Sequence, residues 1–92
     1  MSGPHPLRFP VAPAINRRFR MQWEETQQCH VLLYPEGMVK LNGSAGEILQ
    51  CCDGHNTVDQ IVAILEAKFA TTGLRGDIEG LLAHAYEQDW IV

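Results

Sequence analysis

The hydrophobic pattern of this 92-residue chain changes its period near Asn42. Between residues 18 and 41, apolar side chains alternate with polar ones or follow one another in short β-favouring runs, as strands require. After Asn42, apolar residues recur at intervals of three and four, which is the spacing of one helix face. A chain of this length supports one hydrophobic core, so the order of the two patterns predicts a single α+β domain with its sheet before its helices.

Three strands are predicted before the change of period. Phe19, Met21 and Trp23 alternate with polar residues, and residues 29–34 form an apolar run that Pro35 ends. The Pro-Glu-Gly sequence that follows favours a tight reversal into residues 38–41. We therefore expect a three-stranded antiparallel meander in which the last strand lies at an edge.

Three helices are predicted after Asn42 from their start and stop signals. The expected start signals are a capping box of Ser44 and Glu47, a second box of Thr57 and Gln60, and a cap at Asp77. Asp53-Gly54 is expected to end the first helix, and the second is expected to end before Gly73. Three short strands followed by a three-helix bundle indicate a winged-helix-like fold.

Prolines mark off the beginning of the chain. Four of the five prolines lie within the first fifteen residues, where they remove backbone donors and favour extended geometry. We expect residues 1–17 to form an extended arm and residues 18–92 to form the domain. Exchange of such an arm between two copies would give a homodimer.

Composition narrows the function classes. No stretch approaches the roughly twenty apolar residues of a membrane helix, and three cysteines suit a reducing compartment better than a disulfide scaffold. We expect a cytoplasmic protein with no membrane partner.

Metal binding and catalysis find little support in the sequence. Cys51, Cys52 and His55 are closely spaced, but a structural zinc site usually needs four ligands, and a buried, apolar role suits Cys52 better. No phosphate loop or nucleophile–base motif is present. The prediction is a protein without enzymatic activity, metal or cofactor, and a metal-dependent enzyme is the remote alternative.

Charge bears on nucleic-acid binding, which a winged-helix-like fold makes a natural question. Residues 41–92 carry two basic residues against eight acidic ones, and none of the basic residues follows Arg75. DNA contacts need cations that neutralise phosphates. We expect no nucleic-acid partner, and a degenerate winged-helix DNA-binding or regulatory protein stays the alternative from another class.

The predicted edge strand suggests a binding function. Residues 38–42 contain no proline and no other device that would block pairing with a further strand. An extended peptide can add to such an edge. The sequence leaves open whether a peptide, the N-terminal arm or a second copy of the chain occupies it.

Several of these residues together resemble the PqqD family of pyrroloquinoline quinone biosynthesis. The resemblance runs from about residue 13 to residue 92 and rests on Pro35-Glu36, Leu41-Asn42, Ala45, Ile48-Leu49, Cys52-Asp53-Gly54, Thr57-Val58, Ile61 and Asp77-Ile78. It implies a peptide chaperone of the RiPP recognition element type that binds the precursor peptide PqqA and presents it to the radical SAM enzyme PqqE. The chain departs from the family at Gln88-Asp89-Trp90, where a glycine is more common.

The resemblance also implies where the peptide binds. In this class the peptide adds beside the third strand and lies against the third helix. Carried onto this chain, the implied binding residues are Met38, Val39, Lys40, Leu41, Asn42, Arg75, Ile78, Leu82 and Ala85. Ile78 and Ala85 are expected nearer the groove than Leu81 and Leu82. Proline at Val39 is expected to remove a backbone donor for the peptide.

The two cations of this set have a specific expected role. Lys40 and Arg75 are expected to attract an acidic peptide, and the sequence leaves open that they are ordinary solvated surface charges.

Overall fold

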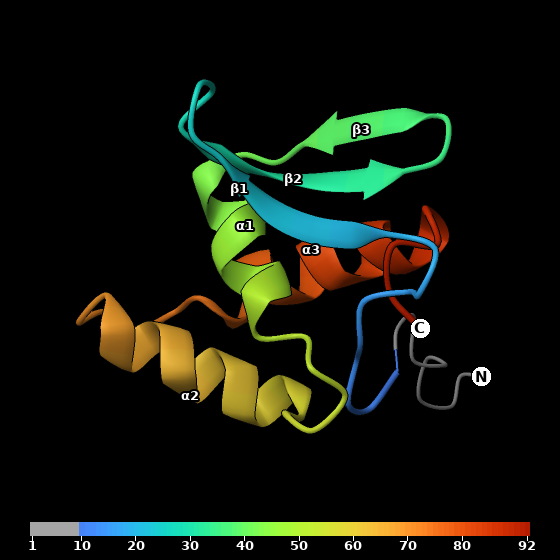
Figure 1. The fold of residues 1–92 in the computed structure, drawn as a ribbon. Coiled ribbons are helices and arrows are strands. Elements are labelled where there is room, and N and C mark those ends of the chain that lie inside the picture. Colours follow the sequence, from blue (N-terminus) through green and yellow to red (C-terminus); the bar gives the residue numbers. More distant parts are fainter. Residues whose placement is uncertain (1–9) are drawn as a thin grey trace.

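The structure, a computed structural model, describes residues 10–92. Its elements follow the predicted order, with three strands first and three helices after them (Figure 1). They are β1 (Arg20–Glu24), β2 (Cys29–Tyr34), β3 (Gly37–Lys40), α1 (Gly43–Gln50), α2 (Val58–Lys68) and α3 (Arg75–Glu87). The predicted α+β class is confirmed.

The sheet is an antiparallel meander with β2 in the middle. β1 pairs with β2 from Arg20 opposite Leu33 to Glu24 opposite Cys29, and β3 pairs with the other side of β2. A two-residue turn joins Tyr34 to Gly37, as Pro-Glu-Gly predicts. Among residues 10–92 no strand pairs with the outer side of β3, so the prediction of an edge strand is confirmed.

The start of α1 differs from the prediction. Asn42, and not Ser44, is the N-cap, and its side-chain oxygen accepts a hydrogen bond from the Ala45 amide at 2.7 Å. Strand pairing decides this position, because the Leu41 amide still donates to the His30 carbonyl and the chain can turn into a helix only afterwards. Asn42 is then the first extended residue with a side chain that can cap.

The boundaries of α2 agree with the local signals. The predicted capping box of Thr57 and Gln60 is confirmed, with both reciprocal hydrogen bonds present. At the other end Ala70 has a φ of 51°, and the Thr71 amide donates to the Glu66 carbonyl at 3.0 Å. This is the arrangement of a Schellman motif, which normally places glycine at the left-handed position.

The start of α3 also differs from the prediction, because the N-cap is Leu74, three residues before Asp77. The helix begins at Arg75, so Asp77 lies inside the first turn and does not cap it. The side chain of Glu66 from α2 accepts the Leu74 amide at 3.0 Å, which satisfies a donor at the helix start by a tertiary contact. Asp77 still favours this end of the helix through the helix dipole.

The end of α3 has the same kind of geometry as the end of α2. Asp89 has a φ of 63°, and the Trp90 amide donates to the Ala85 carbonyl at 2.8 Å. A residue at this position of a Schellman motif adopts the left-handed conformation that glycine takes most easily and that aspartate tolerates.

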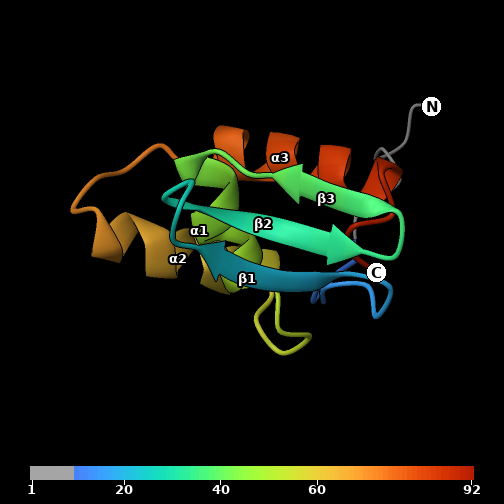
Figure 2. The ribbon, with the colours of Figure 1, turned by 45° about the horizontal axis from the view of Figure 1, so that its top comes forward.

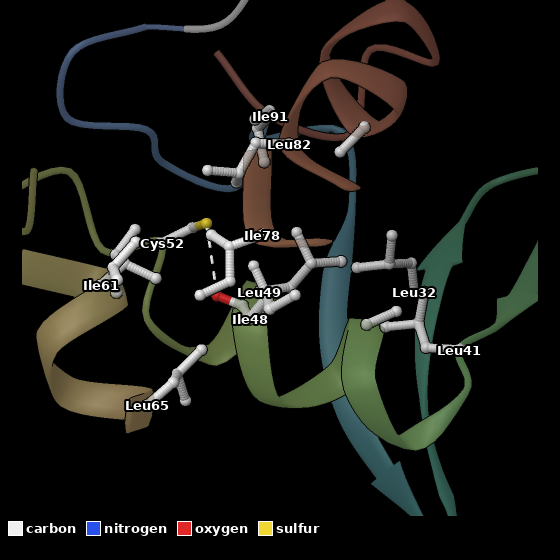
Figure 3. Packing of buried hydrophobic residues seen from close by; sticks show 13 residues of the cluster. Leu32, Leu41, Ile48, Leu49, Cys52, Ile61, Leu65, Ile78, Leu82 and Ile91 are labelled. Atoms are coloured by element: carbon white, nitrogen blue, oxygen red, sulfur yellow. Dashed lines mark hydrogen bonds between the residues drawn. The ribbon is translucent and has the colours of Figure 1, made fainter. Parts of the chain in front are cut away.

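The hydrophobic core lies between the sheet and the helices (Figure 3). α1 packs against β2, α2 and α3 and so sits at the centre of the domain. The core residues are Leu32, Leu41, Ala45, Ile48, Leu49, Cys52, Ile61, Val62, Leu65, Ile78, Leu82, Ala85 and Ile91. Cys52 is buried, as predicted, and its thiol donates to the Ile48 carbonyl at 3.5 Å.

The described part of the N-terminal region is tied to the domain. Ala14 and Val92 exchange two backbone hydrogen bonds, the Asn16 amide donates to the Trp90 carbonyl, and the Gly54 amide donates to the Pro13 carbonyl. Residues 13–16 therefore hold the loop after α1 and the C-terminal residues together. The predicted boundary at residue 17 stays a prediction, and residues 1–9 of the predicted arm lie outside the described residues.

Candidate functional site

The candidate site is the open edge of β3 together with the residues after α3 that share a hollow with it. Figure 2 shows β3 at one edge of the sheet. Val39 of β3 lines one hollow together with Gln88, Asp89 and Trp90, which follow α3. The described residues of the N-terminal region do not cover this edge, because they pair with the loop at Asp53 and with Ile91. The edge is therefore accessible to a further strand.

The pairing register decides which backbone groups of β3 point outward. In an antiparallel pair, hydrogen-bonded and non-hydrogen-bonded residue pairs alternate. The Leu41 amide donates to the His30 carbonyl, and Val39 lies opposite Leu32, two residues further along the same register. Val39 thus turns its backbone groups toward β2. Met38 and Lys40, which are the alternate residues, turn their N–H and C=O groups toward the open edge.

This register corrects one expectation from the sequence. Proline at Val39 would remove a donor to β2, and the donors available to a peptide belong to Met38 and Lys40. The side chains of successive strand residues point to opposite faces of the sheet. Val39 is half-buried and packs against the core, whereas Met38 is 45% exposed and Lys40 is exposed.

Leu41 and Asn42 have structural roles at the end of the strand. Leu41 is 4% exposed and belongs to the core, so its side chain supports the site from inside. Asn42 is exposed, but its side chain caps α1. The side chains of Val39 and Leu41 therefore both point toward the core.

The face of α3 that is buried in the core differs from the face that the sequence predicts. Ile78, Leu82 and Ala85 are each 2% exposed or less, and they face α1 and α2 as part of the core. Leu81, which was expected in the core, is half-buried and packs only at its margin. Ala85 and Leu81 therefore differ from the expectation, whereas Leu82 lies in the core as expected. Ile78 is almost wholly buried and also lines a hollow at the start of α3.

A hollow of about 320 Å³ opens where β3 begins and α3 ends. We call it the aromatic hollow, and it is lined by Arg18, Phe19, Tyr34, Glu36, Val39, Gln88, Asp89 and Trp90. The rings of Phe19 and Tyr34 lie 5.5 Å apart, and Trp90 meets the ring of His84 edge to face. Val39 and Trp90 lie far apart in the sequence, and only the fold brings them into the lining of one hollow.

The two cations expected to attract a peptide lie in different places. Lys40 is exposed on the edge strand itself. Arg75 forms ion pairs with Asp59 and Glu79, whose carboxylates raise the pKa of its guanidinium, and the three residues line a different hollow together with Val11. Arg75 is therefore already neutralised and lies away from the β3 edge.

The cysteines do not form a chemical centre. Burial raises the pKa of the Cys52 thiol to about 12 and also raises that of Cys51. Metal binding and nucleophilic attack both need the thiolate, which such burial disfavours. Within residues 10–92, no three His, Cys, Asp or Glu side chains are close enough to hold a metal ion, and no helix is long and apolar enough to cross a membrane.

Comparison with known proteins gives consistent relatives. The sequence model of "Coenzyme PQQ synthesis protein D (PqqD)" matches residues 29–91. A "PqqA binding protein" of Stutzerimonas stutzeri is 51% identical over 86 residues, covering 92% of this chain and 94% of the relative. Another from Pseudomonas aeruginosa is 54% identical over 80 residues, covering 86% and 87%.

A solved structure has the same fold. It is the PqqD truncation of Methylobacterium extorquens PqqCD, described as a functional and stand-alone RiPP recognition element. It matches with a TM-score of 0.75 and 31% identity, covering 91% of this chain and 94% of the other. The family model matches residues 29–91, which is more than half of the chain, so this chain belongs to the PqqD family.

Proposed function

We propose that this protein binds the precursor peptide PqqA by accepting it as a fourth strand beside β3. The observation that carries the proposal is the orientation of Met38 and Lys40, whose backbone groups point away from β2 at an edge that no described strand covers. The names of the relatives support the identity of the peptide, because they are called PqqA binding proteins.

The geometry supports main-chain recognition with a few side-chain contacts. Two outward residues offer two donors and two acceptors, and side chains of the added strand that point toward the aromatic hollow would meet Val39 and Trp90. Main-chain bonds supply affinity, and neighbouring hollows supply selectivity. Such a short ladder suits an affinity of roughly micromolar or somewhat tighter, which allows release.

The second half of the proposal is presentation of the bound peptide to the radical SAM enzyme PqqE. A peptide held at one edge leaves its remaining residues free for a partner. The protein itself acts without catalysis, metal or cofactor in this proposal. Its cysteine chemistry supports this, since burial favours the neutral thiols. We place this step in the cytoplasm, where unmodified thiols persist.

The experiment that tests peptide capture is an NMR titration of isotope-labelled protein with PqqA. Shifts concentrated in residues 38–42 and around Leu81 and Trp90 are the expected result. Absence of shifts at a millimolar peptide concentration would refute peptide binding. Adding PqqE to the labelled complex tests presentation, because a ternary complex broadens the same signals without restoring their free positions.

Salt dependence separates this function from DNA binding. Backbone-mediated peptide binding should change little between low and moderate salt, whereas DNA binding falls steeply because counterions are released. α3 carries Asp77, Glu79 and Glu87 against one arginine that is already paired. We propose that nucleic acid is not a partner, and steeply salt-dependent binding to duplex DNA would overturn this.

A homodimer formed by exchange of the N-terminal segment stays a further proposal. Residues 14–16 already form a short ladder with residues 90–92, and the same ladder could form between two copies. A monomeric mass by light scattering over a wide concentration range would exclude the exchanged dimer.

A further inference from the structure

A second hollow, of about 420 Å³, lies beyond the other end of β3. We call it the helical hollow, because α1, the end of α2 and the start of α3 line it. Most of its wall is apolar and consists of Ile48, Leu65, Phe69, Leu74 and Ile78. Phe69 is 50% exposed, so half of its surface is available to a ligand in this hollow.

The helical hollow begins shortly after the end of β3 in the chain. Its lining begins at Gly43, three residues after Lys40, and Figure 2 shows β3 pointing toward the start of α1 and the first turn of α3. An extended chain advances about 3.3 Å per residue, so a strand paired with β3 reaches the hollow after roughly three more residues. The peptide that adds to β3 is therefore the occupant that the geometry favours.

The charge of the rim narrows the chemistry of that occupant. Two carboxylates border the hollow, those of Glu47 and Asp77. Glu47 is paired with Lys68, whereas Asp77 forms no salt bridge with any residue of the range 10–92. An apolar wall beside one unpaired carboxylate complements a large apolar side chain that has a basic neighbour.

We propose that the helical hollow is a selectivity pocket for the captured peptide, and that it takes a side chain of leucine or phenylalanine size next to a lysine or arginine. This inference rests on the proposed function. The pocket recognises a residue outside the short β3 ladder, and so it distinguishes one peptide from others that could pair with the same backbone. Burial of one such side chain accounts for about a ten- to hundredfold gain in affinity.

The test blocks the hollow and leaves β3 intact. Gly43 lines the hollow, and a Cβ added there meets no atom within 4 Å, so Gly43→Phe adds a large ring at the rim of the hollow without a clash at its Cβ. Gly76→Phe is the matched control, because Gly76 has the same open surroundings and does not line the hollow. Affinity for PqqA is measured with both variants and with a set of peptides in which each large apolar residue is replaced by alanine.

The expected result is a coupling between the plug and one peptide residue. Gly43→Phe weakens binding of the unmodified peptide at least about tenfold, and Gly76→Phe does not. One of the alanine-substituted peptides binds the Gly43→Phe and Gly76→Phe variants with the same reduced affinity, because it lacks the side chain that enters the hollow. Asp77→Asn is expected to weaken binding a fewfold, and the loss disappears when the neighbouring basic residue of the peptide is neutralised.

Two results separate failure of this inference from failure of the proposed function. The pocket is refuted, and peptide capture stands, if Gly43→Phe binds PqqA with unchanged affinity. The same conclusion follows if every alanine substitution in the peptide lowers its affinity for Gly43→Phe and for Gly76→Phe by the same factor. No binding of PqqA to the unmodified protein overturns both.

Discussion

Proline at Met38 provides a sharp test of strand addition. The Met38 N–H points toward the open edge, so Met38→Pro removes one of the two outward donors of β3 and leaves the bonds to β2 in place. Proline is tolerated on edge strands where its N–H would face solvent. The matched control is Met38→Ala, which shortens a side chain that is 45% exposed and keeps the donor.

The expected loss of affinity follows from one unpaired peptide carbonyl. Leaving a partner unsatisfied costs about 1–3 kcal/mol, so the dissociation constant of the Met38→Pro complex should rise between about fivefold and 150-fold. Met38→Ala should change it less than about threefold, since the backbone bond is retained. Isothermal titration calorimetry with PqqA measures both, and amide NMR spectra verify that each variant is folded.

Val39→Pro distinguishes the two sides of the strand. The N–H of Val39 faces β2, so this substitution should lower the stability of the hairpin by about 1–3 kcal/mol, seen as a lower melting temperature.

Equal affinities of Met38→Pro and Met38→Ala would refute strand addition at this edge. If Met38→Pro does not fold, Lys40→Pro compared with Lys40→Ala repeats the test at the second outward donor.

Three further predictions concern stability. Ala70 has a φ of 51°, so Ala70→Gly should stabilise the protein by about 0.5–1 kcal/mol in urea unfolding, while Ala67→Gly inside α2 should destabilise it by a similar amount; a loss at both positions would contradict the assigned helix end. The backbone amides of Asn56 and His55 donate to Asp53 and lower the pKa of its carboxyl, so the ionised group stabilises the fold above the ordinary aspartate pKa, and this contribution disappears as pH falls through the lower pKa of the folded state. Asp53→Ala should therefore flatten the dependence of stability on pH in that acidic range, and an unchanged dependence would contradict the stabilising role of Asp53. A Cβ at Gly46 would lie 2.9 Å from the His30 ring, so Gly46→Ala should destabilise by about 1–3 kcal/mol and His30→Ala in the same chain should recover much of the loss; equal losses in both backgrounds would exclude the clash.

The secondary structure was largely predictable because its signals are local. The period of two before Asn42 and the period of three to four after it match the observed strands and helices. The capping box at Thr57 was also correct, since its residues lie within one turn of each other. The wrong caps, Ser44 and Asp77, are chemically able to cap. They fail because strand pairing and a contact from α2 set where those helices begin.

The candidate site was predictable only at the level of elements. Alternation along the chain indicated an edge strand, and the family resemblance indicated the helix beside it. Neither specified that Met38 and Lys40 carry the outward backbone groups or that Leu81 lies closer to the surface than Ile78. Strand register depends on the partner strand, and the rotation of α3 depends on how it packs against α1 and α2.

The sequence by itself determined the order of the elements, the absence of a strand-blocking residue at 38–42 and the resemblance to the PqqD family, because each rests on residues close together in the chain or on a pattern along it. Tertiary structure alone decided which atoms are available to a partner. It brought Phe19, Val39 and Trp90 to one end of β3 and three helix segments to the other, and it turned Arg75 away toward Asp59. Contacts between residues far apart in sequence leave no local pattern, and these contacts shape the two hollows at the ends of the binding edge.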